Sequence, residues 1–144
     1  MKQKNNQPVD YSIVIPVYQN EGSLEDTFKL IKEKVIDINS QYSAEVIFID
    51  DGSTDSSFQT LMRLHEAHPK LIVIIKLTRN FGTYPAIIAG YEKARGKCVI
   101  NISADLQEPP ELINDMLNYY FKEKFNIVIC NRDSRDEGFY RTIT

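Results

Sequence analysis

Apolar, β-branched segments alternate along this chain with segments whose apolar residues recur every three or four positions. The first pattern is typical of buried strands and the second of one face of a helix. Strands are predicted over residues 11–17, 45–50, 71–77, 97–102 and 125–130. Helices are predicted from Leu24 to Ile38 (about 16 residues), over 58–65 and 83–94, and after the Pro109-Pro110 pair. This order indicates an α/β fold with a mostly parallel sheet flanked by helices on both faces.

Length and charge exclude several classes of protein. With 144 residues, the chain is expected to form a polar leader over 1–10 and one domain over 11–144. The 17 Lys and Arg against 20 Asp and Glu give a net charge of −3, which argues against a nucleic-acid partner. No apolar run approaches the roughly 20 residues that cross a bilayer. Cys98 and Cys130 lie in apolar runs and are interpreted as reduced core residues of a cytosolic protein.

Polar segments follow the predicted strands, and parallel sheets bind their ligands beyond the carboxyl ends of strands. The most acidic of these segments is Asp50-Asp51-Gly52-Ser53-Thr54-Asp55. Helix capping alone explains its later residues, since Ser, Thr and Asp cap helices well. Capping does not explain two adjacent carboxylates at the end of an apolar strand. We therefore favour a binding role in which Asp51 accepts hydrogen bonds from a nucleotide base or ribose.

A second polar segment follows the fourth predicted strand. Asp105 and Gln107 alternate there, so in an extended loop both side chains project the same way. Two oxygen ligands suit Mg²⁺ or Mn²⁺ on a diphosphate whose own oxygens complete the coordination shell. The alternative is that Asp105 only caps the helix that follows.

Arginines follow the third and fifth predicted strands. Arg79 comes after the third, and Arg132 and Arg135 come after the fifth. Guanidinium groups near a metal site would stabilise a departing diphosphate. Arg132 and Arg135 are equally well explained as solvated partners of the neighbouring acidic residues.

These segments together resemble family 2 inverting glycosyltransferases, which have the nucleotide-diphospho-sugar transferase (A-type) fold. The resemblance runs from SIVIPVYQNEGSL through EVIFIDDGSTDSS, LTRNFGTYPAIIAGYEKARG and SADLQEPPELI to NRDSR. The ADLQ-x-PPE stretch, with RNFG before it and R-x-x-R after it, is most similar to the polyprenyl-phosphate (dolichol-phosphate-mannose-synthase-like) branch.

The resemblance implies a hexosyltransferase that moves a sugar, with inversion, from a nucleoside diphosphate to a polyprenyl phosphate. Asp105 and Gln107 would hold Mg²⁺ or Mn²⁺, while Asp105, Arg132 and Arg135 would act in catalysis. The nucleotide would be bound by Pro16, Tyr18, Glu21, Asp50, Asp51, Ser53, Arg79 and Ala104. Two alternatives stay open: a nucleotide-sugar-binding module without turnover, and transfer to a saccharide hydroxyl in polysaccharide synthesis.

The chain departs from the family pattern at two points. Ser103 occupies the first position of the usual Asp-x-Asp, which predicts weaker metal affinity. The family usually continues past the R-x-x-R segment, so we expect this chain to be the N-terminal donor-binding part, truncated at its C-terminus. Membrane contact is then expected only from segments after Thr144, with the full-length protein at the cytoplasmic face of the membrane.

Overall fold

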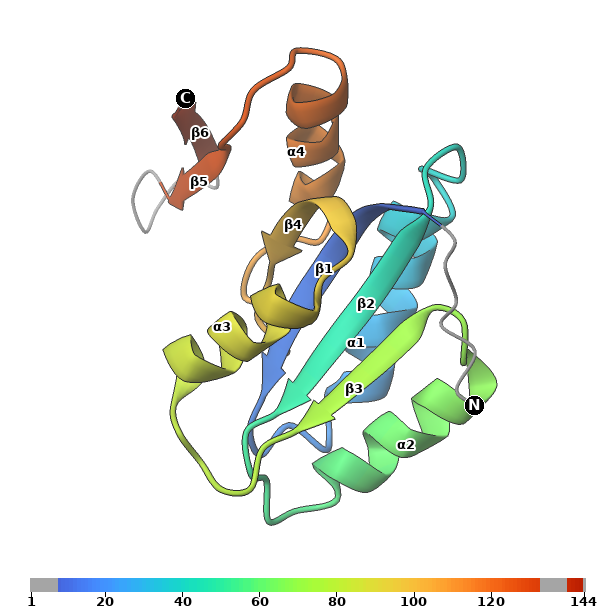
Figure 1. The fold of residues 1–144 in the computed structure, drawn as a ribbon, viewed down its shortest axis with the longest axis vertical. Coiled ribbons are helices and arrows are strands. Elements are labelled where there is room, and N and C mark those ends of the chain that lie inside the picture. The colour runs from blue at the N-terminus through green and yellow to red at the C-terminus, as the bar shows by residue number, and fades with distance from the viewer. Residues whose placement is uncertain (1–7, 133–139, 144) are drawn as a thin grey trace. The chain divides into compact units, whose positions relative to one another are not determined.

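The computed structural model describes residues 8–132 and 140–143. The described chain forms two compact units, one up to Pro110 and one from Glu111, and each is treated by itself. The first unit contains β1 (Val9–Val17), α1 (Leu24–Ile31), the π-helical turn η1 (Lys32–Ile36), β2 (Ala44–Asp50), α2 (Ser57–Ala67), β3 (Ile72–Lys76), α3 (Thr83–Lys93) and β4 (Gly96–Asn101). The second contains α4 (Leu112–Phe121), β5 (Ile129–Arg132) and β6 (Tyr140–Ile143) (Figure 1).

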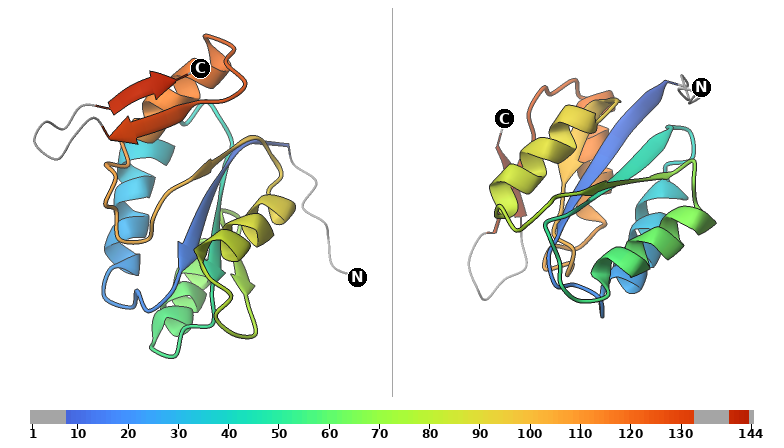
Figure 2. Two further views of the ribbon diagram at one scale, coloured as in Figure 1. Left: turned by 90° about the vertical axis from the view of Figure 1, so that its left-hand side faces the viewer. Right: turned by 60° about the horizontal axis from the view of Figure 1, so that its bottom comes forward.

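The first unit is built on a four-stranded sheet in the order β3-β2-β1-β4, and every neighbouring pair is parallel. Helices α1 and α2 cover one face and α3 covers the other (Figure 2). On the α1 side, Phe28 packs edge-on against Phe48 of β2, with ring centroids 6.5 Å apart. The prediction of a parallel sheet flanked by helices is therefore confirmed.

Helix α3 lies unusually close to the sheet. A β-carbon at Gly90 would lie 2.5 Å from Val14 Cγ1 and 2.8 Å from Ile49 Cδ1. Ala86, one turn earlier, is fully buried beside the same two strand residues. Small side chains on this helix face allow the close approach.

The fifth predicted strand does not join the parallel sheet. The strand lies at Ile129–Arg132 rather than 125–130, and it pairs antiparallel with Tyr140–Ile143. The partner segment follows after only a few residues, so local antiparallel pairing needs no crossover helix. The described sheet of the first unit therefore has four strands, not the five that were predicted for it.

The first predicted helix is shorter and less regular than its periodicity indicated. After Ile31 the helix widens into η1, where the Asp37 N–H donates to the Lys32 carbonyl five residues earlier, at 2.9 Å. A π turn shifts the helix phase. Ile38, predicted on the apolar face, is 60% exposed. Strand β1 starts at Val9, two residues before the predicted start, and Val9 is buried.

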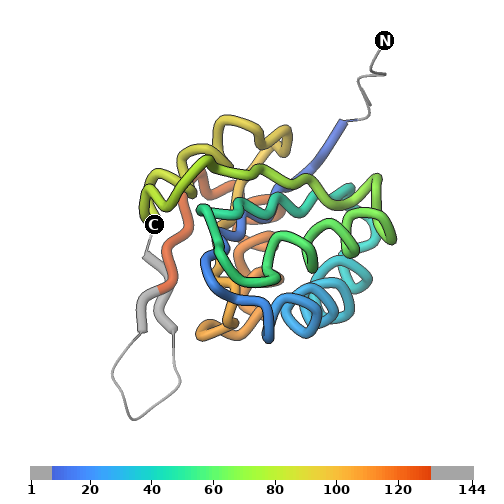
Figure 3. Tube along the Cα trace, turned by 90° about the horizontal axis from the view of Figure 1, so that it is seen from below, coloured from blue at the N-terminus to red at the C-terminus, as the bar shows by residue number. Residues whose placement is uncertain are grey.

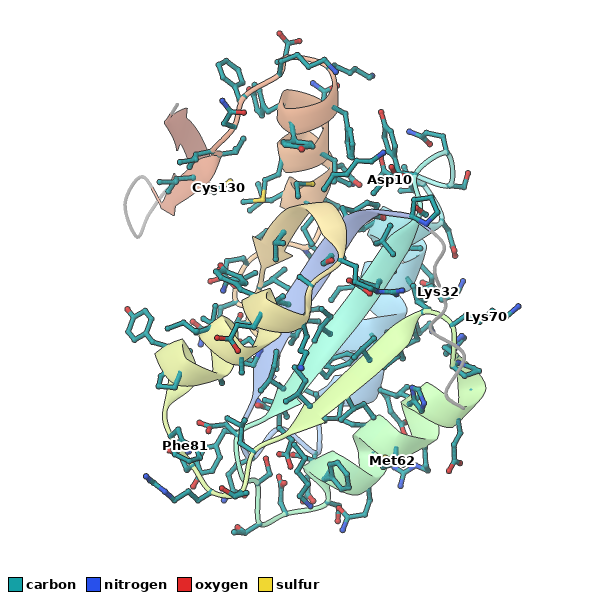
Figure 4. The ribbon with its side chains drawn as sticks, in the orientation of Figure 1. Asp10, Lys32, Met62, Lys70, Phe81 and Cys130 are labelled. Atoms are coloured by element: carbon teal, nitrogen blue, oxygen red, sulfur yellow. The ribbon has the colours of Figure 1, made fainter. Side chains whose placement is uncertain are left out.

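An ion pair with a buried carboxylate lies at the amino end of the sheet. The Glu45 carboxylate, 1% exposed, accepts hydrogen bonds from the Arg95 backbone N–H, from its guanidinium group and from the Ser12 hydroxyl group, at 2.7–2.8 Å. A more exposed pair joins Lys97 to Asp10 at 2.7 Å. Asp10, labelled in Figure 4, lies at the same end. These contacts tie β1, β2 and β4 together at the end opposite the polar strand-end segments.

The second unit contains helix α4 and a two-stranded antiparallel sheet. Helix α4 begins at Leu112, two residues after the Pro pair, and buries Ile113 and Leu117. Tyr119 packs against Phe125, with ring centroids 5.8 Å apart. Within the described residues, no helix has the length and apolar character needed to cross a membrane. Cys98 and Cys130 are both half-buried free thiols, so the prediction that they belong to the core was wrong.

Candidate functional site

The loops that follow β1, β2 and β3 meet at the carboxyl edge of the sheet. Figure 3 looks onto this edge, and Figure 4 labels Phe81 beside it. The parallel register places Val17 beside Asp50 and Asp50 beside Lys76, so all three strands end at the same level. The segments that the sequence singled out after these strands are therefore neighbours in space.

The Asp51 carboxylate fixes the loop after β3. Its Oδ1 accepts the Phe81 backbone N–H at 2.8 Å, and its Oδ2 accepts the Gly82 N–H at 2.9 Å. Asp51 is only 3% exposed, so these charge-assisted bonds are shielded from water. Each carboxylate oxygen keeps a second lone pair, which leaves Asp51 able to accept further donors from a ligand.

Asp50 is buried completely, yet only half of its carboxylate is satisfied. Its Oδ1 accepts the Ser53 N–H at 3.1 Å, and its Oδ2 has no hydrogen-bond partner among the described residues. A buried carboxylate oxygen without a donor is costly. The unpaired Asp50 oxygen thus lowers the stability of the fold at the end of β2, which is where a parallel sheet binds its ligand.

Hydrogen bonds join the loop after β1 to the start of α2. The Ser53 hydroxyl accepts the Gln19 N–H at 3.1 Å, and the Ser56 N–H donates to Glu21 Oε2 at 2.7 Å. Asp55 Oδ1 accepts the Ser57 N–H at 3.0 Å. Asp55 and Glu21 therefore accept the N–H groups at the start of α2, although neither is its N-cap residue. Ser53 instead binds the neighbouring loop.

Three other predicted nucleotide-binding residues lie at this edge. Pro16 is half-buried near the end of β1, and Tyr18, 47% exposed, follows the strand directly. Arg79 is exposed and stacks its guanidinium group over the Phe81 ring, 4.1 Å from the centroid. An aromatic side chain and a cation are thus available to a ligand here.

The loop after β4 carries the predicted metal ligands. Asp105 and Gln107 are both exposed, and Gln107 Nε2 donates to Asp105 Oδ2 at 2.9 Å. The pairing arises in a turn rather than in the predicted extended loop, because the intervening Leu106 has φ +50°. The two side chains nevertheless come together as predicted.

The Asp105 carboxyl group is set up to stay ionised. Burial alone would raise its pKa, but the neighbouring Ser103 hydroxyl group and the hydrogen bonds from Gln107 lower the pKa below the ordinary 3.8. The O–H of Ser103 itself donates to Glu108 Oε2 at 2.7 Å, which brings a second carboxylate close to the loop. Ser103 thus lies beside two carboxylates, whereas an Asp at this position would supply a carboxylate itself.

Asp105 and Gln107 fit a divalent cation whose remaining ligands come from the diphosphate of a bound substrate. A carboxylate and an amide oxygen are hard ligands, and rotating the Gln107 amide would turn its oxygen toward the cation beside Asp105. No cluster of three or more His, Cys, Asp or Glu that could hold a metal occurs in the described part of the chain. Ligands from a diphosphate would complete such a site.

The structure also shows contacts that sequence analysis missed. The Thr27 hydroxyl group donates to the Ala104 carbonyl oxygen at 2.6 Å, which joins α1 to the loop after β4. The one signal in the sequence is a polar residue on the apolar face of the predicted helix, between Leu24 and Phe28. Arg135 lies outside the described residues. Arg132 belongs to β5 of the second unit, so its predicted role stays a prediction.

Comparisons with known proteins show which proteins this chain resembles. The sequence profile described as "Glycosyl transferase family 2" matches residues 12–143. An uncharacterized glycosyltransferase, YkcC of Bacillus subtilis, is 38% identical over 94% of this chain and 41% of its own length. The undecaprenyl-phosphate 4-deoxy-4-formamido-L-arabinose transferase of Pseudomonas aeruginosa is 39% identical over 93% of this chain and 39% of its own length.

A solved structure has the same fold. The mannosyltransferase PcManGT from Pyrobaculum calidifontis, in complex with GDP-Man and Mn²⁺, superposes with a TM-score of 0.72 at 22% identity, over 91% of this chain and 38% of that chain. The chain therefore spans about two fifths of the length of the curated relatives it matches.

Proposed function

The chain belongs to glycosyl transferase family 2, and on that premise we propose that it forms the donor-binding part of an inverting glycosyltransferase. The observation that carries the proposal is the set of hydrogen bonds that joins the loops at the carboxyl edge of the sheet. There the buried Asp50–Asp51 pair holds the loops after β2 and β3, and Ser53 joins them to the loop after β1. A nucleoside diphosphate sugar would bind along this edge, with its base near Asp51 and its diphosphate toward Asp105.

Mg²⁺ or Mn²⁺ would be held by Asp105 and Gln107. When bound, such a cation neutralises charge on the departing diphosphate. The chain's own contribution is to keep the Asp105 carboxylate ionised and beside Gln107. PcManGT, which shares the fold, holds Mn²⁺ together with GDP-Man, and this supports a divalent cation here.

The acceptor we propose is a polyprenyl phosphate. The Pseudomonas aeruginosa relative is named for transfer to undecaprenyl phosphate, and its identity of 39% supports the same acceptor class. A phosphate monoester oxygen is anionic near neutral pH because its second pKa is about 6. It can attack the anomeric carbon without a strong base, while the bond from that carbon to the nucleoside diphosphate breaks and the diphosphate leaves with the electron pair.

Further roles belong to the whole protein. Arg132 and Arg135 would meet the phosphates of the donor or of the lipid, where a guanidinium group stabilises developing negative charge. A membrane-embedded acceptor would bring the protein to the cytoplasmic face of the membrane. Segments outside this chain would then supply the membrane contact and the wall that orients the acceptor.

The test measures binding and transfer separately. Calorimetric titration with UDP and with GDP, in Mn²⁺ and in chelator, should show metal-dependent binding of one nucleotide. Asp105→Asn should remove the metal dependence. Glu25→Gln, at an exposed carboxylate paired with Arg63, should leave it unchanged. Equal binding in metal and in chelator would contradict the role of Asp105.

Transfer is then followed with sugar nucleotides, Mn²⁺ and a short polyprenyl phosphate, with glycolipid and free sugar quantified separately. Glycolipid as the product supports the proposed acceptor. A product formed only with an oligosaccharide acceptor would identify the chain as a polysaccharide-type transferase. Tight donor binding with no transfer by the full-length protein would identify a binding module.

A further inference from the structure

We propose that Thr27 is a positioning residue: its hydroxyl group holds the Ala104 carbonyl oxygen and thereby sets where the Asp105 carboxylate stands for a divalent cation. The inference rests on the proposed function, because it takes Asp105 and Gln107 as the residues that hold the metal of the donor diphosphate.

The contact between Thr27 and Ala104 is short and buried. Thr27 Oγ1 lies 2.6 Å from the Ala104 oxygen, and the two residues are 2% and 4% exposed. A threonine inside a helix often returns its hydroxyl group to the carbonyl four residues earlier. In α1 the Thr27 N–H bonds the Ser23 carbonyl in the ordinary way, and the hydroxyl group donates to a different element.

The loop after β4 has few other anchors. The strand's ladder to β1 ends where the Ile102 N–H donates to the Val14 carbonyl at 3.2 Å. The next backbone bond within the loop joins the Leu106 N–H to the Ser103 carbonyl at 3.4 Å, and Leu106 itself has φ +50°. The Ala104 carbonyl group belongs to the same peptide unit as the Asp105 nitrogen. Fixing that carbonyl therefore fixes the start of Asp105.

Ser23 supports the same carbonyl group from one turn earlier. Its hydroxyl group lies 3.3 Å from the Ala104 oxygen and 3.3 Å from the Asn20 oxygen. Since a serine has a single O–H to donate, this bond is weaker than that of Thr27. Ser23 stands at the N-cap of α1 but makes no side-chain capping bond, which leaves its hydroxyl group for these carbonyls.

The contact between Thr27 and Ala104 also connects the two sides of the proposed site. Helix α1 follows the loop after β1, and that loop is bonded to Ser53 and to Asp55. Thr27 therefore connects the proposed base-binding side, which includes Asp51, to the proposed diphosphate-binding side at Asp105. Residues that orient a metal ligand in this way typically change metal affinity by about 10–100-fold when they are mutated.

The test compares Thr27→Val, which keeps the side-chain shape and removes the hydroxyl group, with Thr27→Ser, which restores it. Free Mn²⁺ is measured by electron paramagnetic resonance in the presence of whichever of UDP and GDP the wild type binds. Thr27→Val should weaken Mn²⁺ binding by about tenfold or more, and Thr27→Ser should recover most of the loss. Amide exchange at Leu106 and Gln107, measured without metal, should be faster in Thr27→Val than in the wild type.

Thr60→Val is the matched control, because Thr60 is a buried helical threonine whose hydroxyl group accepts a bond from Arg63. It should change neither Mn²⁺ affinity nor loop exchange. Equal losses in Thr60→Val and Thr27→Val would reduce the effect to general destabilisation and overturn the proposal. Should Thr27→Val not fold, Ser23→Ala tests the same carbonyl group through the weaker bond, with a smaller loss of Mn²⁺ affinity expected.

The two possible failures are distinguishable. A wild type that binds Mn²⁺ with nucleotide, and a Thr27→Val variant with the same affinity and the same loop exchange, would overturn the role of Thr27 and leave donor binding intact. A wild type that binds neither nucleotide with Mn²⁺ would overturn the proposed function, and this inference with it.

Discussion

Gly52 lies so close to Arg79 that a β-carbon at Gly52 would stand 2.8 Å from the Arg79 Cα and nearer still to its carbonyl carbon. Gly52 also has φ +71°, a conformation that L-residues with a side chain rarely adopt. Both constraints come from the packing of the loop after β2 against the loop after β3. The glycine is thus required by the contact between the two loops.

Gly52→Ala should therefore destabilise the chain and displace the loop after β3. We expect a loss of about 3 kcal/mol in the free energy of unfolding, from backbone strain plus overpacking. Urea unfolding followed by circular dichroism measures it. Gly22→Ala is the control, since nothing lies within 4 Å of a β-carbon at Gly22, and it should stay within about 0.5 kcal/mol of the wild type. Similar losses in both variants would show that the two loops do not constrain Gly52.

Asp51→Asn should weaken nucleotide binding and loosen the loop after β3. An amide side chain has one acceptor oxygen, so it cannot serve both the Phe81 and the Gly82 N–H as the carboxylate does. The expected loss of stability is about 2 kcal/mol. Urea unfolding and calorimetric titration with UDP and GDP measure the two effects. Wild-type nucleotide affinity in a destabilised variant would restrict Asp51 to a structural role.

Glu45→Ala should reduce stability without changing the site. It leaves the Ser12 hydroxyl group and the Arg95 N–H without their acceptor, which should cost about 3 kcal/mol. Because Glu45 lies at the amino end of β2, nucleotide affinity of the folded chain should match the wild type. Asp10→Asn, at the more exposed pair with Lys97, should change stability by less than about 0.5 kcal/mol. A loss of nucleotide affinity in Glu45→Ala would show that the two ends of the sheet are coupled.

Cys98 should react slowly with thiol reagents at pH 8. Burial, with a smaller contribution from Asp10, raises the pKa of the Cys98 thiol from 9.0 to about 11, and only the thiolate is nucleophilic. The rate of alkylation by iodoacetamide, followed by mass spectrometry, should rise to its half-maximum near the raised pKa. A half-maximum near pH 9 would show a solvated thiol.

The same shift predicts how stability depends on pH. The folded pKa lies above the unfolded value, so the folded state retains the Cys98 proton to higher pH. The resulting stabilisation is complete below the unfolded pKa of 9.0 and is lost as the pH rises through about 11. Cys98→Ala should make stability less dependent on pH in that window. An unchanged pH profile would contradict the shift.

The sequence by itself determined the order of the elements, the parallel sheet and the polar segments that follow its strands. These features depend on local periodicity and on residue type, which can be read over short windows. The acidic pair after β2 and the Asp105–Gln107 pair could be placed at strand ends for the same reason. Local periodicity also misled: it extended the first helix through Ile38, and it could not show that Ile129–Arg132 pairs with a later strand.

Only the tertiary structure decided how these segments bond to one another. Asp51 binds Phe81, 30 residues later, and Thr27 binds Ala104, 77 residues later. Neither pair has a local signal, because each depends on strand register and on how a helix sits on the sheet. The backbone donors and acceptors involved are present at every residue, so composition cannot identify them. Packing alone determined which carboxylate holds a loop and which stays free to meet a ligand.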